Sequence, residues 1–207
     1  MLDGALVAPL GAARRLKEIV AEGDMAAQSV RISGFANAGG AWGFHPDFVT
    51  IHRDDGGFVG ARREAAPRAF RQPKDDAERV YLCGLSILSC LTVPLAMLGD
   101  GVRAEELGAW FEQGQTWRRL KVTAPEGALA YAREAVMYFD DNGMVRRTDF
   151  DLVCGETVPI VTYSSAYQSF SGLTVPTLHR ALRRGPQGGV PGKSPLLDIE
   201  IFDATFD

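Results

Sequence analysis

Apolar and polar residues alternate with a period of two along most of this chain. The alternation is clear in residues 29–35, 47–53 and 58–63, and again across much of 116–206. Successive side chains of an extended strand point to opposite faces, so this pattern predicts β-strands with one buried face. We expect about nine strands, placed in 28–72 and 116–206 and joined mostly by hairpins, which makes the sheet antiparallel.

Three turn sequences separate neighbouring strand-like runs: Asp54-Asp55-Gly56-Gly57, Asp140-Asp141-Asn142-Gly143 and Ser171-Gly172. Asn and Gly tolerate the positive φ angles that tight hairpin turns require. Asn142-Gly143 is therefore the strongest hairpin signal in the sequence.

Segment 74–98 has a different pattern and is predicted to be a long helix. Asp75 or Asp76 can cap its start, because a carboxylate accepts hydrogen bonds from the free N–H groups there. No residue from 80 to 98 is charged, a length near the lower limit for crossing a bilayer. Pro94, the polar residues within the run and the lack of a basic flank argue against a membrane span. A helix that is apolar nearly all round must be covered nearly all round, so we expect it beneath the sheet.

Two shorter helices are also predicted. Residues 10–22 place apolar side chains on one helical stripe before Gly23, and 102–111 form a second short helix, so that 74–111 is a helical insertion. Strand-rich halves around such an insertion indicate an α+β fold. We expect one domain over 1–207, a strongly curved antiparallel sheet (half-barrel or lipocalin-like barrel) wrapped around one long apolar helix.

Charge and cysteine content narrow the classes of partner. The net charge of −4 argues against nucleic acid, because binding to phosphates needs a surplus of Lys and Arg. Cys83, Cys90 and Cys154 form no Cys-x-x-Cys pair and have no histidine at metal-ligand spacing, so we expect no metal. Free thiols and the absence of an export signal at the N-terminus predict a cytoplasmic location.

The sequence holds no recognisable catalytic or cofactor motif. The paired glycines match neither the dinucleotide fingerprint nor the phosphate-binding loop, so no cofactor is expected. Three histidines are present, His45, His52 and His179, and none accompanies a nucleophile motif. Whether the protein is an enzyme stays open at this point.

Arg146 departs from the pattern of its strand, residues 144–152. It falls among the apolar positions, which are Met144, Thr148, Phe150 and Leu152, while Arg147, Asp149 and Asp151 occupy the other, solvated face. An inward guanidinium needs an acidic or carbonyl partner, because burying it unpaired is costly. Arg146 is therefore either internally paired or an anchor for a polar or anionic group of a ligand.

Tyrosine and tryptophan side chains add to this candidate site. Tyr163 and Tyr167 share one face of the next strand, and a phenol suits both the edge of a core and the wall of a pocket. His179 and Trp42 complete the set of candidate ligand-binding residues.

The second half of the chain resembles a group of uncharacterised bacterial proteins, over about residues 28–206. The hairpin pattern Phe-Asp-x-x-Gly-x-x-x-Arg-x-Asp, residues 139–149, and the pattern Gly-x-x-Val-Pro-Thr, residues 172–177, are shared with curved-sheet proteins similar to bacterial lipoprotein carriers. This resemblance implies a concave sheet closed by the helix at 74–98 around a lipophilic ligand. Gly40-Ala41-Trp42 resembles the Gly-x-Trp signature of lipocalins.

Three functions are consistent with these observations. The first is binding of a small lipophilic or amphipathic molecule in a cavity between sheet and helix, with Arg146, Tyr163, Tyr167 and His179 as polar contacts. The second is an isomerase, cyclase or hydrolase acting on a hydrophobic metabolite, with His179 or an acidic side chain as base. The third is a structural or interaction protein with a filled core. An enclosed cavity separates the first two from the third.

Overall fold

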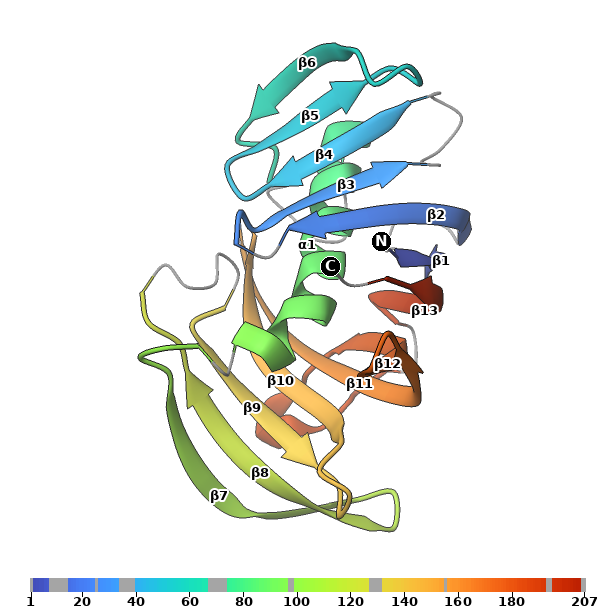
Figure 1. Cartoon of the computed structure of the whole chain (residues 1–207). Coiled ribbons are helices and arrows are strands. Elements are labelled where there is room, and N and C mark those ends of the chain that lie inside the picture. Colours follow the sequence, from blue (N-terminus) through green and yellow to red (C-terminus); the bar gives the residue numbers. More distant parts are fainter. Residues whose placement is uncertain are drawn as a thin grey trace.

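Strands and one long helix account for most of the chain in the computed structural model (Figure 1). The structure describes residues 2–7, 15–24, 26–33, 40–66, 74–96, 99–126, 132–154, 156–192 and 195–205. Within them lie β1 (Leu2–Val7), β2 (Arg15–Asp24), β3 (Ser29–Ser33), β4 (Ala41–His45), β5 (Phe48–His52), β6 (Phe58–Arg63), α1 (Asp76–Ala96), β7 (Arg103–Glu112), β8 (Gln115–Thr123), β9 (Glu134–Phe139), β10 (Val145–Cys154), β11 (Glu156–Phe170), β12 (Leu173–Arg183), the 3-10 helix η1 (Pro186–Gly188) and β13 (Leu197–Ala204).

The described strands form one 13-stranded sheet in the order β6-β5-β4-β3-β2-β1-β13-β12-β11-β10-β9-β8-β7. The first and last strands, β1 and β13, pair antiparallel near its middle and join the two halves of the chain. The outermost described strands, β6 and β7, lie at opposite ends of this order. The curved antiparallel sheet is confirmed, but it is open, so the closed lipocalin-like alternative is wrong and nine strands was too few.

Three of the predicted hairpins are confirmed. β5 pairs with β6, β9 with β10, and β11 with β12, each antiparallel across the expected turn. Gly143 has φ +76° in the second of these turns, in agreement with the role assigned to Asn142-Gly143. Within the range 28–72 in which strands were expected, residues 34–39 and 67–72 lie outside the described part of the chain.

The helix predicted at 10–22 is wrong, because Arg15–Asp24 forms β2 between β1 and β3. Ile19 and Ala21 are buried while Glu22 is exposed, which is the two-residue period of a strand. The same apolar residues also fit a helical stripe, so their spacing alone does not distinguish a helix from a strand. Pairing with β1 and β3 makes the segment a strand.

The short helix predicted at 102–111 is also wrong. Arg103–Glu112 forms β7, which pairs antiparallel with β8 and sets Trp110 opposite Trp117. The helix-favouring residues Ala104 to Leu107 are mostly exposed on this outermost strand. Local propensity is a weak guide where cross-strand packing is available.

The long helix occupies Asp76–Ala96 and packs against β3, β4 and β5. Asp75 caps it as expected, since its Oδ1 accepts from the N–H of Glu78 at 3.0 Å, and this hydrogen bond lowers the pKa of Asp75. Every residue from Val80 to Ser89 is buried. Among the helices of the described part of the chain, none is long and apolar enough to cross a membrane.

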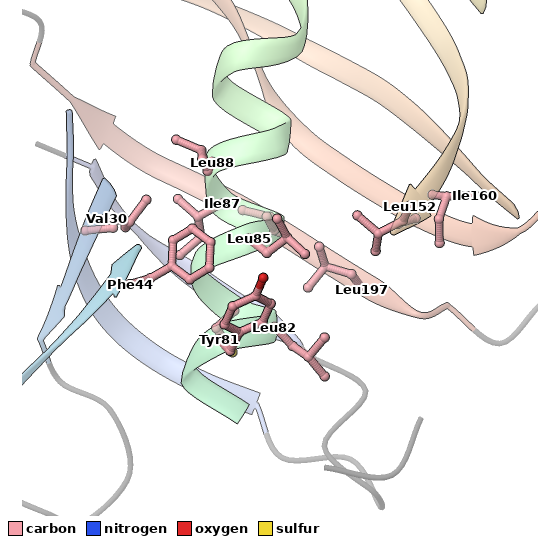
Figure 2. Packing of buried hydrophobic residues seen from close by; sticks show 14 of the residues in the cluster. Val30, Phe44, Tyr81, Leu82, Leu85, Ile87, Leu88, Leu152, Ile160 and Leu197 are labelled. Carbon is pink, nitrogen blue, oxygen red and sulfur yellow. The ribbon is translucent and has the colours of Figure 1, made fainter. Parts of the chain in front are cut away.

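The core lies between α1 and the sheet (Figure 2). Phe44 of β4 meets Tyr81 edge to face, with ring centroids 5.1 Å apart. Gly84 lies against the same phenylalanine, and a Cβ atom at position 84 would lie 2.2 Å from Phe44 Cβ. Gly84 therefore permits the close approach of helix and strand. On the other side of the helix, Leu85 faces Leu197 of β13.

Candidate ligand-binding groove

Strands β8 to β13 carry different side chains on their two faces. The face toward α1, the helix face, is apolar and includes Phe150, Ile160 and Ala181. On the opposite face, the outer face, the register of pairing sets six side chains in one row: Arg119, Tyr138, Arg147, Tyr163, Arg180 and Asp198. Directly paired residues of neighbouring strands point the same way, so this polar row crosses all six strands.

Arg147 lies in the middle of the row and is 1% exposed. Its Nε donates to Asp149 Oδ1 at 2.7 Å, and its Nη2 donates to Asp149 Oδ2 at 2.9 Å. Nη1 donates to Glu112 Oε2 at 2.6 Å, and Nη2 also donates to the carbonyl oxygen of Gly188 at 2.5 Å. One guanidinium therefore ties β10 to β7 and to η1. A buried charge is tolerated where its partners are this complete.

Aromatic rings surround the same guanidinium. Its central carbon lies 4.9 Å from the ring centroid of Tyr138, 5.3 Å from that of Trp110 and 5.7 Å from that of Tyr163. Tyr138 donates its hydroxyl to Asp149 at 2.9 Å, and Tyr163 donates to Glu112. The negative faces of the rings favour the cation, and their hydroxyls complete the shell of its two carboxylates.

The pKa values follow from this network. Burial alone would raise the pKa of Glu112, but hydrogen bonds from Tyr163, Trp110 and Arg147 outweigh it and lower the pKa. Burial alone would lower the pKa of Arg147, but Asp149 and Glu112 hold it above its usual value. Burial and the neighbouring Asp149 raise the pKa of Tyr138 to about 12. Glu112 and Arg147 therefore stay charged, and Tyr138 stays neutral, at physiological pH.

A groove of about 1370 Å³ runs along the outer face beside this network. One wall is the β7–β8 hairpin, and another is the segment 185–192, called the strap below, which contains η1. The groove is lined by Trp110, Glu112, Gln113, Gln115, Trp117, Arg146, Arg147, Tyr163, Ser164, Ser165, Leu178, His179, Arg180, Leu182, Gly188, Gly189, Val190, Gly192, Asp198, Ile199, Glu200 and Phe202. It is large enough for a ligand of drug size or longer.

Comparison with solved structures identifies the architecture. A LolA superfamily protein from Nitrosomonas europaea is similar over 98% of this chain and 83% of its own, at 9% identity and a TM-score of 0.52. The fold is LolA-like.

Two further structures are similar over nearly the whole chain. An outer membrane lipoprotein-sorting protein domain from Vibrio parahaemolyticus covers 98% of this chain and 82% of its own, at 10% identity and a TM-score of 0.46. A DUF1329 family protein from Desulfovibrio piger covers 97% and 82%, at 11% identity and a TM-score of 0.46. No family model matches the chain, and no curated protein matches it.

The groove brings together three of the five predicted site residues. Arg146, Tyr163 and His179 line it, but Tyr167 and Trp42 do not. Trp42 is buried in the core on β4, far along the strand order. Tyr167 donates its hydroxyl to the carbonyl oxygen of Val145 at 2.6 Å.

The buried arginine of β10 is Arg147 rather than Arg146, which corrects the sequence analysis. The pairing of β10 with β9 shifts between Val145 and Arg147, so Arg146 is the extra residue of a bulge and strict alternation fails there. The Arg146 side chain is 33% exposed and pairs with Asp140 at 2.7 Å. Its internal pairing agrees with one of the two interpretations of this residue.

His179 points away from the groove floor. It pairs directly with Ser164, and both alternate with Tyr163 and Arg180, whose side chains form the polar row. Ser164 Oγ lies 3.4 Å from His179 Nδ1, and His179 Nε2 lies 3.1 Å from the carbonyl oxygen of Pro176. Since a carbonyl only accepts, Nε2 carries the proton and Nδ1 accepts from the serine. The side chains of this pair therefore belong to the helix face, opposite the polar row.

Several groove residues were not predicted from sequence. Arg147 and its partner Asp149 were assigned to the solvated side of their strand, Trp110 was assigned to a helix, and Glu112 was not placed in any predicted element. A signal was present, because Arg147 and Asp149 are the Arg and Asp of the shared hairpin pattern at 139–149. Within the described residues, no three His, Cys, Asp or Glu side chains are grouped to hold a metal.

Proposed function

We propose that this protein binds an amphipathic molecule with an apolar chain, held along the groove on the outer face. The observation that carries the proposal is the groove itself, which sets apolar side chains beside the polar row. Leu178 and Phe202 are 40% and 54% exposed, and Leu182 and Val190 line the same space. An apolar chain covering these side chains removes apolar surface from water, at about 25 cal/mol per Å².

The groove does not lie where the sequence analysis placed the ligand, which was between the sheet and the helix. The space between α1 and the sheet holds the packed core of Leu82, Leu85 and Leu88 with Phe150 and Ile160. None of the groove-lining residues comes from the described part of α1. We therefore propose that the ligand lies on the outer face rather than under the helix. Similarity to a LolA superfamily protein supports a carrier or binding role over the filled-core alternative.

The enzyme alternative has weaker support at this groove. A hydrolase needs a nucleophile and a base that both reach the ligand. Ser164 and His179 are groove-lining residues 3.4 Å apart, but they alternate with the residues of the polar row, so their side chains belong to the helix face. The cytoplasmic location stays a prediction.

Tryptophan fluorescence tests the proposal directly. Trp110 and Trp117 line the groove, whereas Trp42 is in the core. An uncharged amphiphile that carries a bromine or nitroxide on its apolar chain quenches only tryptophans that it contacts. We expect saturable quenching of part of the tryptophan emission of the wild type. In the double variant Trp110→Phe/Trp117→Phe this quenching should be lost.

A matched pair of variants places the ligand. Leu178→Arg puts a charge in the groove, and Leu173→Arg makes the same change on the same strand outside the groove. The two leucines are 40% and 45% exposed, so neither change disturbs the core. We expect Leu178→Arg to weaken binding at least tenfold and Leu173→Arg to leave it unchanged. Equal effects, or no saturable quenching, would overturn the proposal.

A further inference from the structure

Each arginine that lines the groove already has a carboxylate partner. Arg146 pairs with Asp140 at 2.7 Å, and Arg147 pairs with Asp149 and Glu112 at 2.7 and 2.6 Å. Arg180 pairs with an aspartate of β13, from Nε to Asp198 Oδ1 at 2.7 Å. The positive charges of the groove are therefore neutralised within the protein.

Glu200 differs from these residues. Its carboxylate lines the groove, is exposed, and has no hydrogen-bond or ion-pair partner among the described residues. Leu178 lies directly opposite it on β12, and Phe202 follows two residues along β13 on the same face. An unpaired carboxylate thus lies between two exposed apolar side chains.

Among the described residues that line the groove or pair with its arginines, carboxylates outnumber arginines. Three arginines line it, and the carboxylates that line it or pair with them are more numerous, namely Glu112, Asp140, Asp149, Asp198 and Glu200. The chain as a whole also carries a net charge of −4. Among the described residues that line the groove, an anionic head group would meet no arginine free of a carboxylate, whereas a cationic one would meet Glu200.

We propose that the groove selects amphipathic molecules with a cationic head group. The cation lies beside Glu200, and the apolar chain covers Leu178 and Phe202. This inference rests on the proposed function, because it names the class of ligand that the same groove takes. Glu200 is a specificity-determining residue in this arrangement, and the apolar contacts supply the larger share of the affinity.

Calorimetry with three single-chain amphiphiles of equal tail length tests the selection. Dodecyltrimethylammonium is cationic, dodecyl maltoside is uncharged and dodecanoate is anionic, and each is used below the concentration at which it forms micelles. We expect the cationic amphiphile to bind about three- to tenfold more tightly than the anionic one, an advantage that shrinks at about 1 M salt because exposed charges are screened. Equal or tighter binding of dodecanoate would overturn the inference.

Two charge variants separate a specific contact from general attraction. Glu200→Gln removes the groove carboxylate, and Glu105→Gln removes an exposed carboxylate of β7 outside the groove. Glu200→Gln should weaken dodecyltrimethylammonium binding about two- to fivefold, the range of an exposed ion pair, and leave dodecyl maltoside unchanged. Equal effects of the two variants would refute the role of Glu200.

Failure of the proposed function gives a different result. In that case dodecyl maltoside does not bind, or its binding is insensitive to Leu178→Arg, whatever the charge series shows. Binding of all three amphiphiles with equal affinity, lost in Leu178→Arg, would keep the proposed function and reject the cationic selection.

Discussion

In the middle of strands β9 to β11 both faces of the sheet are buried, but by different chemistry. On the helix face, Phe150 is 7% exposed and packs with the apolar residues of α1. On the outer face, Arg147 is 1% exposed and is enclosed by two carboxylates and three aromatic rings. The same strands therefore carry an apolar core on one side and a charged one on the other.

This difference determines how each face responds to change. An apolar core loses stability in proportion to the surface and volume removed. A buried ion network responds more abruptly, because removing one partner leaves the others charged and without compensation. Variants on the two faces should therefore separate clearly in unfolding experiments.

The largest effect is expected for Arg147→Ala. It leaves Asp149 and Glu112 without their cation and removes the hydrogen bond to Gly188. We expect the free energy of unfolding to fall by about 3–5 kcal/mol, measured by urea denaturation. Adding Asp149→Asn to the same chain should restore part of this loss, because one uncompensated charge is then gone.

The neighbouring arginine is the control for this prediction. Arg146→Ala breaks a partly exposed pair with Asp140 and should lower the free energy of unfolding by about 0–1 kcal/mol. If Arg146→Ala is as destabilising as Arg147→Ala, the distinction between the two residues is wrong.

Arg147 also shows where inference from the sequence fails. Alternation assigned it to the solvent side, since a strand buried on one face has polar residues on the other. Here both faces are buried, and the bulge at Arg146 shifts the register with β9. Neither feature can be read from a single strand. Burial of the outer face depends on the strap and the β7–β8 hairpin, and the bulge depends on the pairing with β9. The shared Arg-x-Asp pattern was the better guide.

The elements with local signals were predicted well. Asp75 caps α1, and Asn142-Gly143 forms the turn between β9 and β10, because each signal acts within a few residues. β2 and β7 were assigned to helices because their strand character comes from pairing with distant segments. The fold class followed from periodicity, whereas the groove depends on contacts such as that of Arg147 with Gly188, far apart in sequence.

On the helix face, His179 makes the free energy of unfolding depend on pH. Burial lowers the pKa of His179 to about 4, against about 6.5 in an unfolded chain. Between these values the unfolded state binds more protons, so stability falls as pH drops from about 6.5 to about 4. We expect His179 to account for a loss of about 3 kcal/mol over this range.

Comparing the wild type with His179→Gln isolates the contribution of His179 to the pH dependence of stability, since the two proteins share all other titrating groups. The difference in the free energy of unfolding between wild type and variant should depend on pH below about 6.5 and be constant above it. A constant difference down to about pH 4 would show that the imidazole is not buried in its neutral form.

Gly84→Ala tests the packing of α1 against β4. Helix propensity alone predicts a gain of about 1 kcal/mol, because alanine favours helices over glycine. The added Cβ would lie 2.2 Å from Phe44 Cβ, so we expect a net loss of about 1–2 kcal/mol in urea denaturation. Gly60→Ala on β6 meets no atom within 4 Å and should change stability little. Stabilisation by Gly84→Ala would contradict the close approach.

The smallest effect tests how the strap meets the charged network. Gly188 and Gly143 have nearly equal φ angles, +78° and +76°, so alanine at either position costs about 1 kcal/mol in backbone strain. At Gly188 a Cβ would also lie 3.3 Å from Arg147 Nη2 and from Trp110, whereas at Gly143 it meets nothing within 4 Å. We expect Gly188→Ala to lose about 0.5–1 kcal/mol more than Gly143→Ala, because the strap must shift away from Arg147. The same shift should change the emission of Trp110 in Gly188→Ala alone. Equal losses and unchanged emission would mean that the strap does not rest on the guanidinium, and the wall it forms along the groove would then lack its support.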